Sequence, residues 1–407
     1  MLEALFDTTT TRSRARVLLA RARAGHSTHF AVHDDALPSV ASFVAQTTRS
    51  RYPDLNIPYH SRWRHFEAGS IHRRVWLDEL QSGASNDPVT LIDLVVVSVL
   101  LDAGAGASWQ YKEARTGQVH TRSEGLGVAS FHAFCIGLFS SDATQPLRVD
   151  AQGLQSLSSI KLAQAFQVTD SNPLVGLEGR VNLLRRLGHA LAEQREVFGA
   201  NPPRVGNLYR FMQLGGKESA LNAAKSIAAH DLLALLLKTL SRIWPSGNVF
   251  DGKAVGDCWP HAALGKSSSP EGWIPFHKLS QWLTYSLLEP FEWSGVHITG
   301  LDALTGLPEY RNGGLLLDGG VISLKNAETA KHAHPPHEEF IVEWRALTVA
   351  LLDELAPLVR QQLGKTADEM PLACILEGGT WAAGRVLAQN LRAGSPPLQI
   401  ESDGTIF

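Results

Sequence analysis

Apolar residues recur at helical spacing along most of the chain, and strict alternation of apolar and polar positions is confined to short stretches. From Phe340 to Leu355 the apolar positions follow one helix face, and Pro357 is expected to kink or end that helix. The run 231–244 is leucine-rich almost all round, which is typical of a buried central helix. The pattern predicts a mainly α fold with a small β component.

Three short stretches favour strands paired across glycine-containing turns. They span residues 108–122, 315–324 and 398–407. We expect them to form a small sheet beside the helices. No loop is long enough for a clear interdomain linker. The sequence therefore predicts a single large domain over residues 1–407, or two closely packed lobes of about 1–200 and 201–407.

Composition restricts the class of partner. The 407 residues are 44% hydrophobic and carry a formal net charge of −3, which gives no basic surface for nucleic acid. Three widely spaced cysteines, Cys135, Cys258 and Cys374, fit a reducing compartment. No apolar run reaches the ~20 residues that span a bilayer, and residues 1–23 lack a signal-peptide core. We expect a cytoplasmic protein that binds neither nucleic acid nor membrane, in an oligomeric state that the sequence leaves open.

Carboxylates close to tryptophans occur three times inside apolar stretches. These groups are Asp102 with Trp109, Glu343 with Trp344 and Arg345, and Glu377 with Trp381. A buried carboxylate is costly unless it is paired or binds a ligand, so the three places predict one lined pocket. Helical geometry puts Glu343 at the margin of the apolar stripe and points Arg345 away from it. The structural alternatives are a Glu343–Arg345 ion pair and a Glu377–Trp381 helix contact.

The segment 52–66 combines extended, proline-containing backbone with arginines, histidines and aromatic residues. Arg62, Arg64 and His65 in this segment suit the binding of an anion beside a planar group. The alternative is that the arginines pair with carboxylates such as Asp54 or Glu67 as structural ties.

A helix is predicted over 276–290, ending at Pro290. Lys278, Gln281, Tyr285 and Glu289 lie near one stripe of it and could offer a cation, an amide, a hydroxyl and a carboxylate to a ligand. In the structural alternative Lys278 is exposed and Glu289 caps neighbouring amides.

The sequence gives no reason to expect a cofactor. It contains no glycine-rich nucleotide loop, no nucleophile elbow and no Cys-x-x-Cys pair. His332, His334 and His337 could bind a metal, but they lie in a proline-rich loop without a second group of ligands, and Cys258 with His261 supplies only two. We expect neither a metal nor a redox cofactor.

Four long motifs resemble a family named for fungal uracil catabolism, the URC4/Urg3 type. The motifs span residues 52–66, 276–290, 307–314 and 375–385. The resemblance covers nearly the whole chain and implies a pathway in which uracil is converted to its ribonucleotide, the ring is opened, and urea is released. The step that belongs to this family does not follow from its name.

A second, more distant resemblance is to the queuosine 5′-phosphate glycosidases of queuine salvage, helical proteins similar to helix-hairpin-helix DNA glycosylases. It is carried by Asp102 with Trp109, by the run Val342 to Arg345, and by Glu377 with Trp381, in the same order along the chain. This chain lacks the Asp-Tyr-Arg motif of those enzymes, and Glu289 is the nearest substitute for its aspartate.

Together the resemblances imply hydrolysis of an N-ribosylurea 5′-phosphate to urea and ribose 5-phosphate. Glu289 is then expected to stabilise positive charge at C1′, and Asp102 to bind the urea nitrogens. Glu377 is expected to hold ribose hydroxyls. Arg62, Arg64, His277 and Lys278 compete for the phosphate. The remaining candidate contacts to the phosphorylated ribosyl substrate are His65, Trp109, Gln281, Tyr285, Glu343, Arg345 and Trp381.

Two other functions stay open at this point. One is a non-catalytic nucleotide-binding regulator or scaffold of pyrimidine degradation, which would need the same pocket without a competent carboxylate. The other is a phosphoribosyltransferase or another ureido-ribosyl hydrolase. The transferase is disfavoured by the lack of an acidic pair followed by a small-residue phosphate loop.

Overall fold

The computed structural model describes residues 2–214, 225–244 and 247–401. Two compact units are built from interleaved segments: unit 1 contains residues up to 60, 248–281 and 300–401, and unit 2 contains 61–247 and 282–299. Helix α13 (Lys278–Trp293) supplies residues to both units. The structure is 58% helix and 9% strand, which confirms the predicted mainly α class with a small β component.

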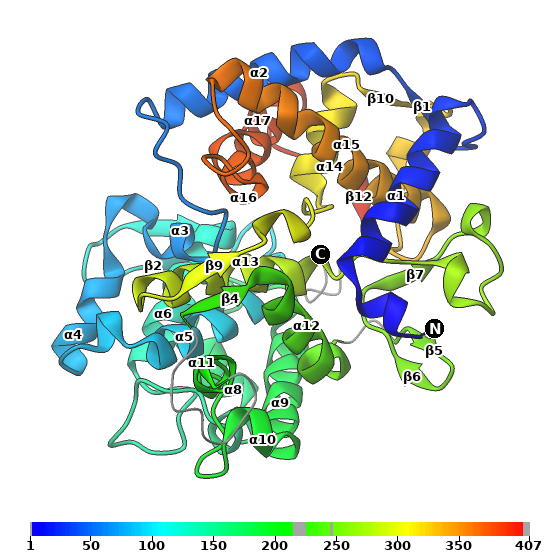
Figure 1. Cartoon of the computed structure of the whole chain (residues 1–407). Helices are drawn as coiled ribbons and strands as arrows, with labels where there is room; N and C mark the ends of the chain where they lie inside the picture. Colours follow the sequence, from blue (N-terminus) through cyan, green and yellow to red (C-terminus); the bar gives the residue numbers. More distant parts are fainter. Residues whose placement is uncertain (1, 215–224, 245–246, 402–407) are drawn as a thin grey trace. The chain divides into compact units, whose positions relative to one another are not determined.

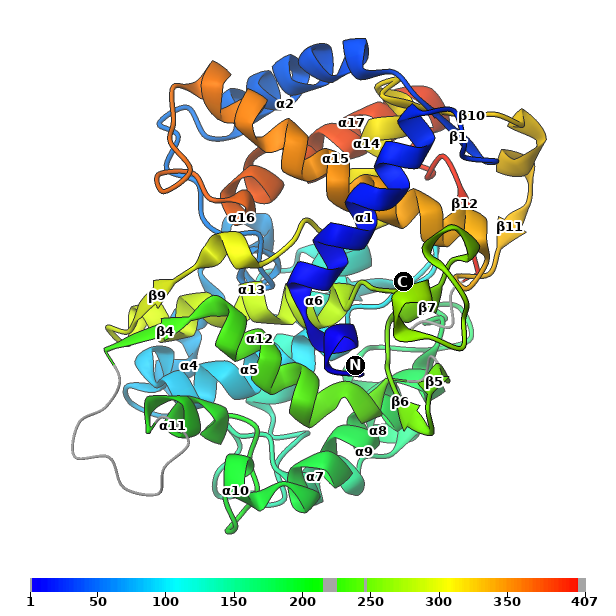
Figure 2. The same cartoon turned by 45° about the vertical axis from the view of Figure 1, so that its right-hand side comes forward.

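Unit 1 is organised around the long helix α15 (Glu339–Leu363), which is buried along most of its length. Helices α1 (Thr8–Arg23) and α2 (Leu37–Arg51) pack against it, and Figures 1 and 2 show α1 crossing α15. Helix α14 (Tyr310–Asp318) packs on α17 (Trp381–Arg392). The shorter helical elements are η1 (Leu2–Phe6), η2 (Asp34–Ala36), η7 (Ala262–Leu264), η8 (Pro270–Gly272), η9 (Leu301–Ala303), η10 (Ala327–Lys331), α16 (Leu372–Ile375) and the π-helical turn η11 (Leu376–Thr380).

The strands of unit 1 form two-stranded ribbons. Three ribbons are antiparallel and one is parallel. The antiparallel pairs are β1 (Phe30–Val32) with β10 (Ile322–Leu324), β5 (Val249–Phe250) with β6 (Lys253–Ala254), and β7 (Cys258–Pro260) with β8 (Trp273–Pro275). The parallel pair is β11 (Ala333–His334) with β12 (Gln399–Ile400).

Unit 2 is built on α5 (Pro88–Leu100), which begins where the Asp87 carboxylate accepts the N–H groups of Val89 and Thr90. Its core also includes α6 (Arg122–Cys135) and α9 (Leu177–Glu193). The other helical elements are α3 (Trp63–Phe66), η3 (Ala68–Ser70), η4 (Arg73–Trp76), α4 (Leu77–Leu80), η5 (Ala84–Asn86), α7 (Ala151–Gln155), α8 (Ser159–Ala165), α10 (Arg195–Phe198), α11 (Asn207–Gln213), α12 (Ala229–Leu240) and η6 (Ser241–Ile243). The ribbons are β2 (Gln110–Lys112) antiparallel to β3 (Val119–Thr121), and β4 (Ser226–Ala228) parallel to β9 (His297–Thr299).

A buried aspartate ties α5 to the rest of unit 2. The Asp93 carboxylate accepts hydrogen bonds from the backbone N–H groups of Val149 (2.8 Å) and Gly206 (2.6 Å) and from the Arg204 guanidinium (2.5 Å). Burial nevertheless raises the pKa of Asp93 to about 6, because the three donors only partly offset desolvation. The burial of Asp93 is therefore explained by its role in holding α5 against these segments.

A second buried carboxylate fixes the β2–β3 hairpin. Glu113 accepts two bonds of 2.7 Å from Arg73, and further bonds from Thr116 and His132. Burial acts to raise the pKa of Glu113, but these donors outweigh it and hold the pKa at about 2. The hairpin itself was predicted correctly from the sequence.

Helix α13 does not end at Pro290, as the sequence suggested, but continues to Trp293. A proline inside a helix leaves the carbonyl four residues earlier without its N–H partner. That carbonyl belongs to Ser286, and the indole Nε1 of Trp63 donates to it at 3.0 Å. An external donor thus offsets the loss. Helix α15 likewise continues beyond Pro357.

Other predictions need correction. The stretch 315–324 is the end of α14 followed by β10, and β10 pairs with β1 instead of forming a hairpin. Within 398–407 the structure places β12, which pairs with β11, and residues 402–407 lie outside the described part of the chain. Helix α12 exposes Asp231 and Lys238, so it is not buried all round. The predicted small sheet is replaced by separate ribbons within the described residues.

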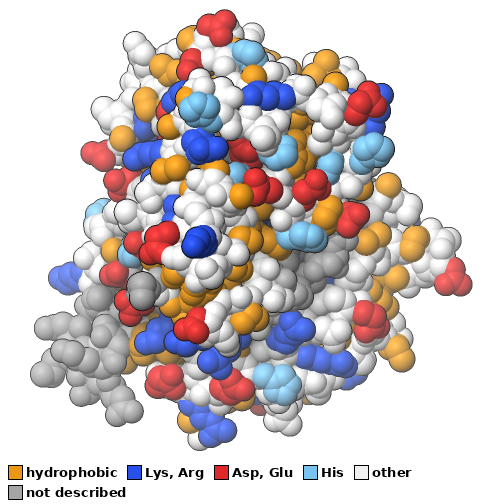
Figure 3. Space-filling model, turned by 90° about the vertical axis from the view of Figure 1, so that its right-hand side faces the viewer, with side chains coloured by type: hydrophobic (Ala, Val, Ile, Leu, Met, Phe, Trp, Pro, Cys, Tyr) orange, Lys and Arg blue, Asp and Glu red, His pale blue; other side chains and the backbone are white. Residues whose placement is uncertain are grey.

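Acidic, basic and histidine side chains are interspersed among the described residues on the side drawn in Figure 3. Within residues 2–214, 225–244 and 247–401, none of the helices combines the length and the apolar character needed to cross a membrane.

Candidate active site

Unit 2 places a glutamate of α13 against the segment that begins at Ser61. The Ser61 hydroxyl donates a short hydrogen bond to Glu289 Oε2, and Arg64 Nη2 donates to Oε1 at 2.7 Å. The backbone N–H of Arg62 donates to the Ser286 hydroxyl at 2.9 Å, which fixes the segment on α13. Glu289 and Arg64, both named as site candidates from the sequence, therefore contact each other directly, whereas their roles stay predictions.

Glu289 is ionised with difficulty. Its side chain is nearly inaccessible to solvent, and burial raises its pKa to about 7 against the opposing charge of Arg64 and the Ser61 hydrogen bond. Nearby Glu67 and Glu292 raise it further. A carboxyl group that titrates near neutral pH can donate or accept a proton under physiological conditions.

Arg62 connects the same segment to Asp102. Its fully buried guanidinium lies 2.5 Å from Asp102 Oδ1 and donates to the Ser98 hydroxyl at 2.7 Å. Burial lowers the pKa of Arg62, and the charge of Asp102 opposes this effect. Asp102 is therefore an ion-paired carboxylate.

The three other candidates in unit 2 lie close to α13 or α6. The His65 Nδ1 lies 3.0 Å from Arg62, and its ring meets the Trp282 ring edge to face at 5.9 Å. Trp109 is buried, and its indole donates to the Phe166 carbonyl at 3.1 Å. Tyr285 is completely buried in α13. His65 thus contacts Arg62 of the Arg62–Asp102 pair, whereas the indole N–H of Trp109 is bonded to Phe166.

Unit 1 holds a second buried glutamate, on the π-helical turn η11. Glu377 Oε1 accepts from Arg51 (2.9 Å) and the Tyr52 hydroxyl (3.1 Å), and Oε2 accepts from His60 Nδ1 (2.9 Å). Burial acts to raise the pKa of Glu377, but the His60 hydrogen bond and the charges of His60 and Arg51 outweigh it and keep the pKa below its ordinary value. Glu377 is therefore a carboxylate with both oxygens engaged.

The π-helical turn brings Glu377 close to α2. A Cβ on Gly379 would lie 2.5 Å from Thr48 Oγ1 and 2.5 Å from a methyl group of Val44, so only glycine fits there. Single π-helical turns within helices are frequent at functional sites. The ring of Trp381, one turn further on, lies 6.3 Å from the His60 ring.

Glu309 and Lys278 are two half-buried groups of unit 1. Glu309 caps α14 by accepting from the N–H groups of Arg311 (2.8 Å) and Asn312 (2.6 Å). Burial raises the pKa of Glu309, and the charges of Lys278 and His60 act against this shift. Lys278 donates its backbone N–H to Asp257 at 3.0 Å.

The remaining candidates in unit 1 have structural partners. His277 Nε2 lies 2.6 Å from the Leu5 carbonyl, and burial lowers the pKa of His277. The Gln281 amide donates to Thr305 at 2.6 Å. Neither contact supplies evidence for a phosphate site, and the binding roles of His277 and Gln281 stay predictions.

Glu343 and Arg345 do not pair with each other as the structural alternative supposed. Arg345 is buried instead of pointing away from the core, and it makes two bonds of 2.7 Å to Asp257. Glu343 Oε2 lies 3.7 Å from His261 Nε2, and hydrogen bonds from His261 and Ser27 lower its pKa although burial opposes them. Residues 340–352 of helix α15 are all buried, so this part of the helix has no solvent-exposed face onto which Arg345 could point.

Several residues of these clusters were missed in the sequence. They are Arg51, Tyr52, His60, Ser61, Arg74 and Glu309. Four of the six lie in or next to the segment 52–66, whose density of charged and aromatic residues was the available signal. Glu309 lies in the motif 307–314, where a carboxylate before a Tyr-Arg-Asn sequence indicates a helix cap.

The described part of the chain holds no cluster of three or more His, Cys, Asp or Glu side chains that could bind a metal ion. His334, in the loop considered from the sequence, bonds Glu338 through Nδ1 and the Thr329 carbonyl through Nε2, each at 2.7 Å. Both of its nitrogens are therefore engaged.

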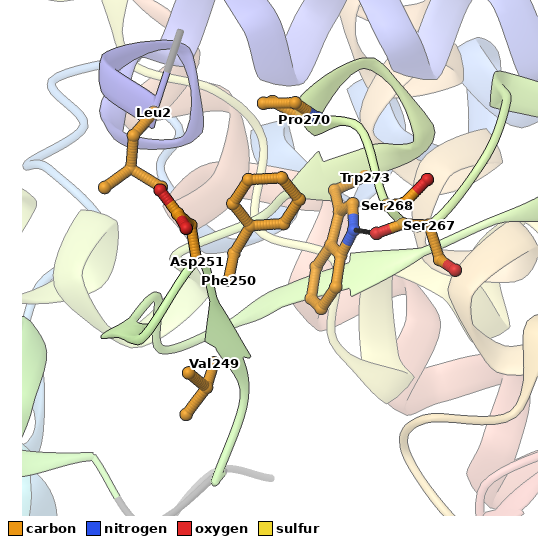
Figure 4. A pocket seen from close by; sticks show the side chains of 8 residues that line it. All are labelled: Leu2, Val249, Phe250, Asp251, Ser267, Ser268, Pro270 and Trp273. Atoms are coloured by element: carbon orange, nitrogen blue, oxygen red, sulfur yellow. Dashed lines mark hydrogen bonds between the residues drawn. The ribbon is translucent and has the colours of Figure 1, made fainter.

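A hollow of about 420 Å³ lies elsewhere in unit 1 (Figure 4). The rings of Phe250 and Trp273 meet edge to face at 5.7 Å in its wall. Asp251 is the one ionisable residue in the lining, which otherwise consists of Leu2, Val249, Ser267, Ser268 and Pro270. A single carboxylate offers no acid–base pair, so the two glutamate clusters are the better candidates.

Comparison with known proteins agrees with the resemblance seen in the sequence. A family model described as "Protein of unknown function (DUF1688)" matches residues 4–407. The chain is 40% identical to "Protein urg3" of Schizosaccharomyces pombe over 97% of its own length and 96% of that protein. It is 38% identical to "Uracil catabolism protein 4" of Lachancea kluyveri over 94% and 93% of the two chains. The chain therefore belongs to the DUF1688 family, together with these URC4/Urg3-type proteins.

Proposed function

We propose that this protein is an N-ribosyl hydrolase of uracil catabolism, which cleaves an N-ribosylurea 5′-phosphate to urea and ribose 5-phosphate. The pathway is suggested by the name of the Lachancea kluyveri relative. The reaction is suggested by the resemblance of the acidic motifs to queuosine 5′-phosphate glycosidases, and the DNA-glycosylase-like fold of those enzymes is part of the same proposal. Opening the ring of a uridine nucleotide would leave the ribosylurea whose N-glycosidic bond must still be broken.

The observation that carries the proposal is the pair of unlike carboxyl groups in unit 2. Glu289 titrates near pH 7, whereas Asp102 is ion-paired with Arg62. Residues 61–64 contact both, through Ser61 and Arg64 on one carboxyl and Arg62 on the other. Hydrolysis of a glycosidic bond uses one group that gives a proton and one that stays negative.

In the proposed step the C1′–N bond breaks and its electron pair goes to the urea nitrogen, which takes a proton from Glu289. Asp102 stabilises the positive charge that develops at C1′. Water then adds its oxygen to C1′, and the proton that it loses restores Glu289. The products are urea and ribose 5-phosphate, and atoms and charge balance. This assignment exchanges the two roles expected from the sequence, because a neutral Glu289 is the better acid.

The test is to incubate the purified full chain with N-ribosylurea 5′-phosphate and to measure urea and ribose 5-phosphate together. The proposal requires the two products in equal amounts. Binding of the compound without release of either product would overturn it in favour of a non-catalytic regulator of pyrimidine degradation. Absence of both binding and release would reject this substrate.

A further inference from the structure

Arg74 in unit 2 is a guanidinium with no carboxylate in salt-bridge contact among the residues that the structure describes. It stacks over Trp293, with its central carbon 3.9 Å from the ring centroid, and the Trp63 ring meets the same indole edge to face at 4.8 Å. Its Nη1 is buried and donates no hydrogen bond within the described residues. Burial lowers the pKa of Arg74, and the charges of Glu289 and Glu67 oppose that shift. Stacking fixes the orientation of the planar cation.

Arg64 is a second guanidinium with an N–H group that donates no hydrogen bond within the described residues. Its Nη2 is bonded to Glu289, and its Nη1 lies 3.5 Å from Glu67, but its Nε is buried without a hydrogen-bond partner in the described part of the chain. Arg64 and Arg74 interact electrostatically with each other and with Glu289. Arg64 and Arg74 are thus two like charges with unused buried N–H groups beside the Glu289 carboxyl, which is an unusual concentration of donors.

We propose that Arg64 and Arg74 bind the phosphate group of the substrate, so that unit 2 recognises a phosphomonoester beside Glu289. Planar arginine forks match phosphate oxygens, and the unused N–H groups provide the donors. Arg62, the other arginine of the segment, already contacts Asp102 and Ser98. The identity of the rest of the ligand rests on the proposed function, whereas the phosphate site itself does not.

Phosphate binding should change the protonation of Glu289. The charged groups that act on Glu289 are Arg64 and Glu67 of the segment around α3, Arg74 of η4, and Glu292 of α13. A phosphate dianion next to these groups disfavours a further negative charge, so it raises the pKa of Glu289. At pH 8 the free carboxyl is mostly ionised, and binding is expected to take up part of a proton. The ligand would thereby prepare the proposed proton donor.

Calorimetric titration of the full chain with inorganic phosphate, ribose 5-phosphate and ribose tests the site. We expect phosphate and ribose 5-phosphate to bind and ribose alone to bind far more weakly. Arg74→Met should weaken phosphate binding on the order of 10- to 100-fold, the usual range for a charged hydrogen-bond partner. Titrations at pH 8 in two buffers of different ionisation enthalpy should show proton uptake that disappears in Glu289→Gln.

Arg115 provides a matched control. It stacks over Trp76 at 4.0 Å, but both of its terminal nitrogens are bonded to Glu79. Arg115→Met should therefore leave phosphate binding unchanged. Equal losses in the two variants, or no loss in Arg74→Met, would overturn the site.

Two further outcomes separate this inference from the proposed function. If Arg74→Met does not fold, Arg74→Lys keeps the charge and loses the planar fork, and it should still weaken phosphate binding. Phosphate binding without cleavage of N-ribosylurea 5′-phosphate would reject the hydrolase and support the site. Cleavage with an unchanged KM in the folded Arg74 variant would reject the phosphate site alone.

Discussion

Glu289 in unit 2 and Glu377 in unit 1 are almost equally buried, with 7% and 6% of their surface exposed, yet their pKa values move in opposite directions. Glu289 accepts hydrogen bonds from one hydroxyl and one arginine, and two other glutamates act on it electrostatically. Glu377 accepts hydrogen bonds from an arginine, a phenol and an imidazole. Because burial acts to raise both pKa values, the opposite directions follow from the donors and charges around each carboxyl.

The two environments suit different tasks. Glu289 can exchange a proton near neutral pH, whereas Glu377 is a permanent anion that fixes its neighbours. Because His60 uses Nδ1 to bond Glu377, its Nε2 is the nitrogen left to meet other groups. Glu377 is in this respect a positioning residue, and its expected role with ribose hydroxyls stays a prediction.

Neutralising Glu289 should have the largest effect on turnover. Glu289→Gln removes the proposed proton donor but keeps a neutral group of the same shape, so we expect release of urea to fall by about 10²- to 10⁴-fold. Thermal unfolding should change little. Glu193→Gln, at an exposed position of α9, is the control and should retain activity. Full activity in Glu289→Gln would remove the residue from the mechanism.

Neutralising Glu377 should instead cost stability. Glu377→Gln leaves three donors without their anion, and because Arg51 is partly exposed we expect a loss of about 2–3 kcal/mol in the free energy of unfolding at pH 7. The folded pKa lies below the ordinary 4.5, so the contribution is complete above pH 4.5 and disappears as pH falls through the folded value. Denaturant unfolding at several pH values checks this. A constant difference down to low pH would contradict it.

The pH dependence of turnover should follow Glu289. If protonated Glu289 is the acid, kcat/KM, which reports the free protein, falls above its pKa of about 7, tenfold for each further pH unit. The descending limb should persist in an Arg115→Met variant, which touches neither glutamate cluster. A rate that keeps rising to pH 9 would assign the titrating group to another residue.

Removing a single donor from Glu377 should have the smallest effect. Tyr52→Phe deletes one hydrogen bond, which typically costs about 1 kcal/mol. In a double-mutant cycle with Glu377→Gln the cost should shrink, because the phenol then faces a neutral amide. Equal costs in both backgrounds would show that Tyr52 stabilises the fold independently of Glu377.

Elements with local signals were predictable from the sequence. Apolar spacing located α15, and glycine in a turn located the β2–β3 hairpin. Local rules failed where a distant residue supplied the missing interaction. Pro290 was expected to end α13, but Trp63, which is remote in sequence, bonds the carbonyl that the proline leaves open. Strand β10 similarly finds its partner in β1 near the N-terminus.

The candidate sites were only partly predictable for the same reason. Composition singled out the segment 52–66 and the carboxylates Asp102, Glu289 and Glu377. It could not show that Glu377 meets His60 across 317 positions, or that Arg345 takes Asp257 instead of Glu343 as its partner. Charge pairing over such separations depends on tertiary packing, which residue spacing does not encode.

The interleaved segments of the two units have a consequence for synthesis on the ribosome. All described residues of unit 2 have been synthesised once the ribosome has passed position 299. In unit 1, by contrast, α1 and α2 pack on α15, η11 and α17, which are synthesised last. At roughly 5–20 residues per second, the apolar side of α1 stays without its partner for some tens of seconds. The apolar side of α1 is thus exposed during synthesis, although it is covered once α15 has been made.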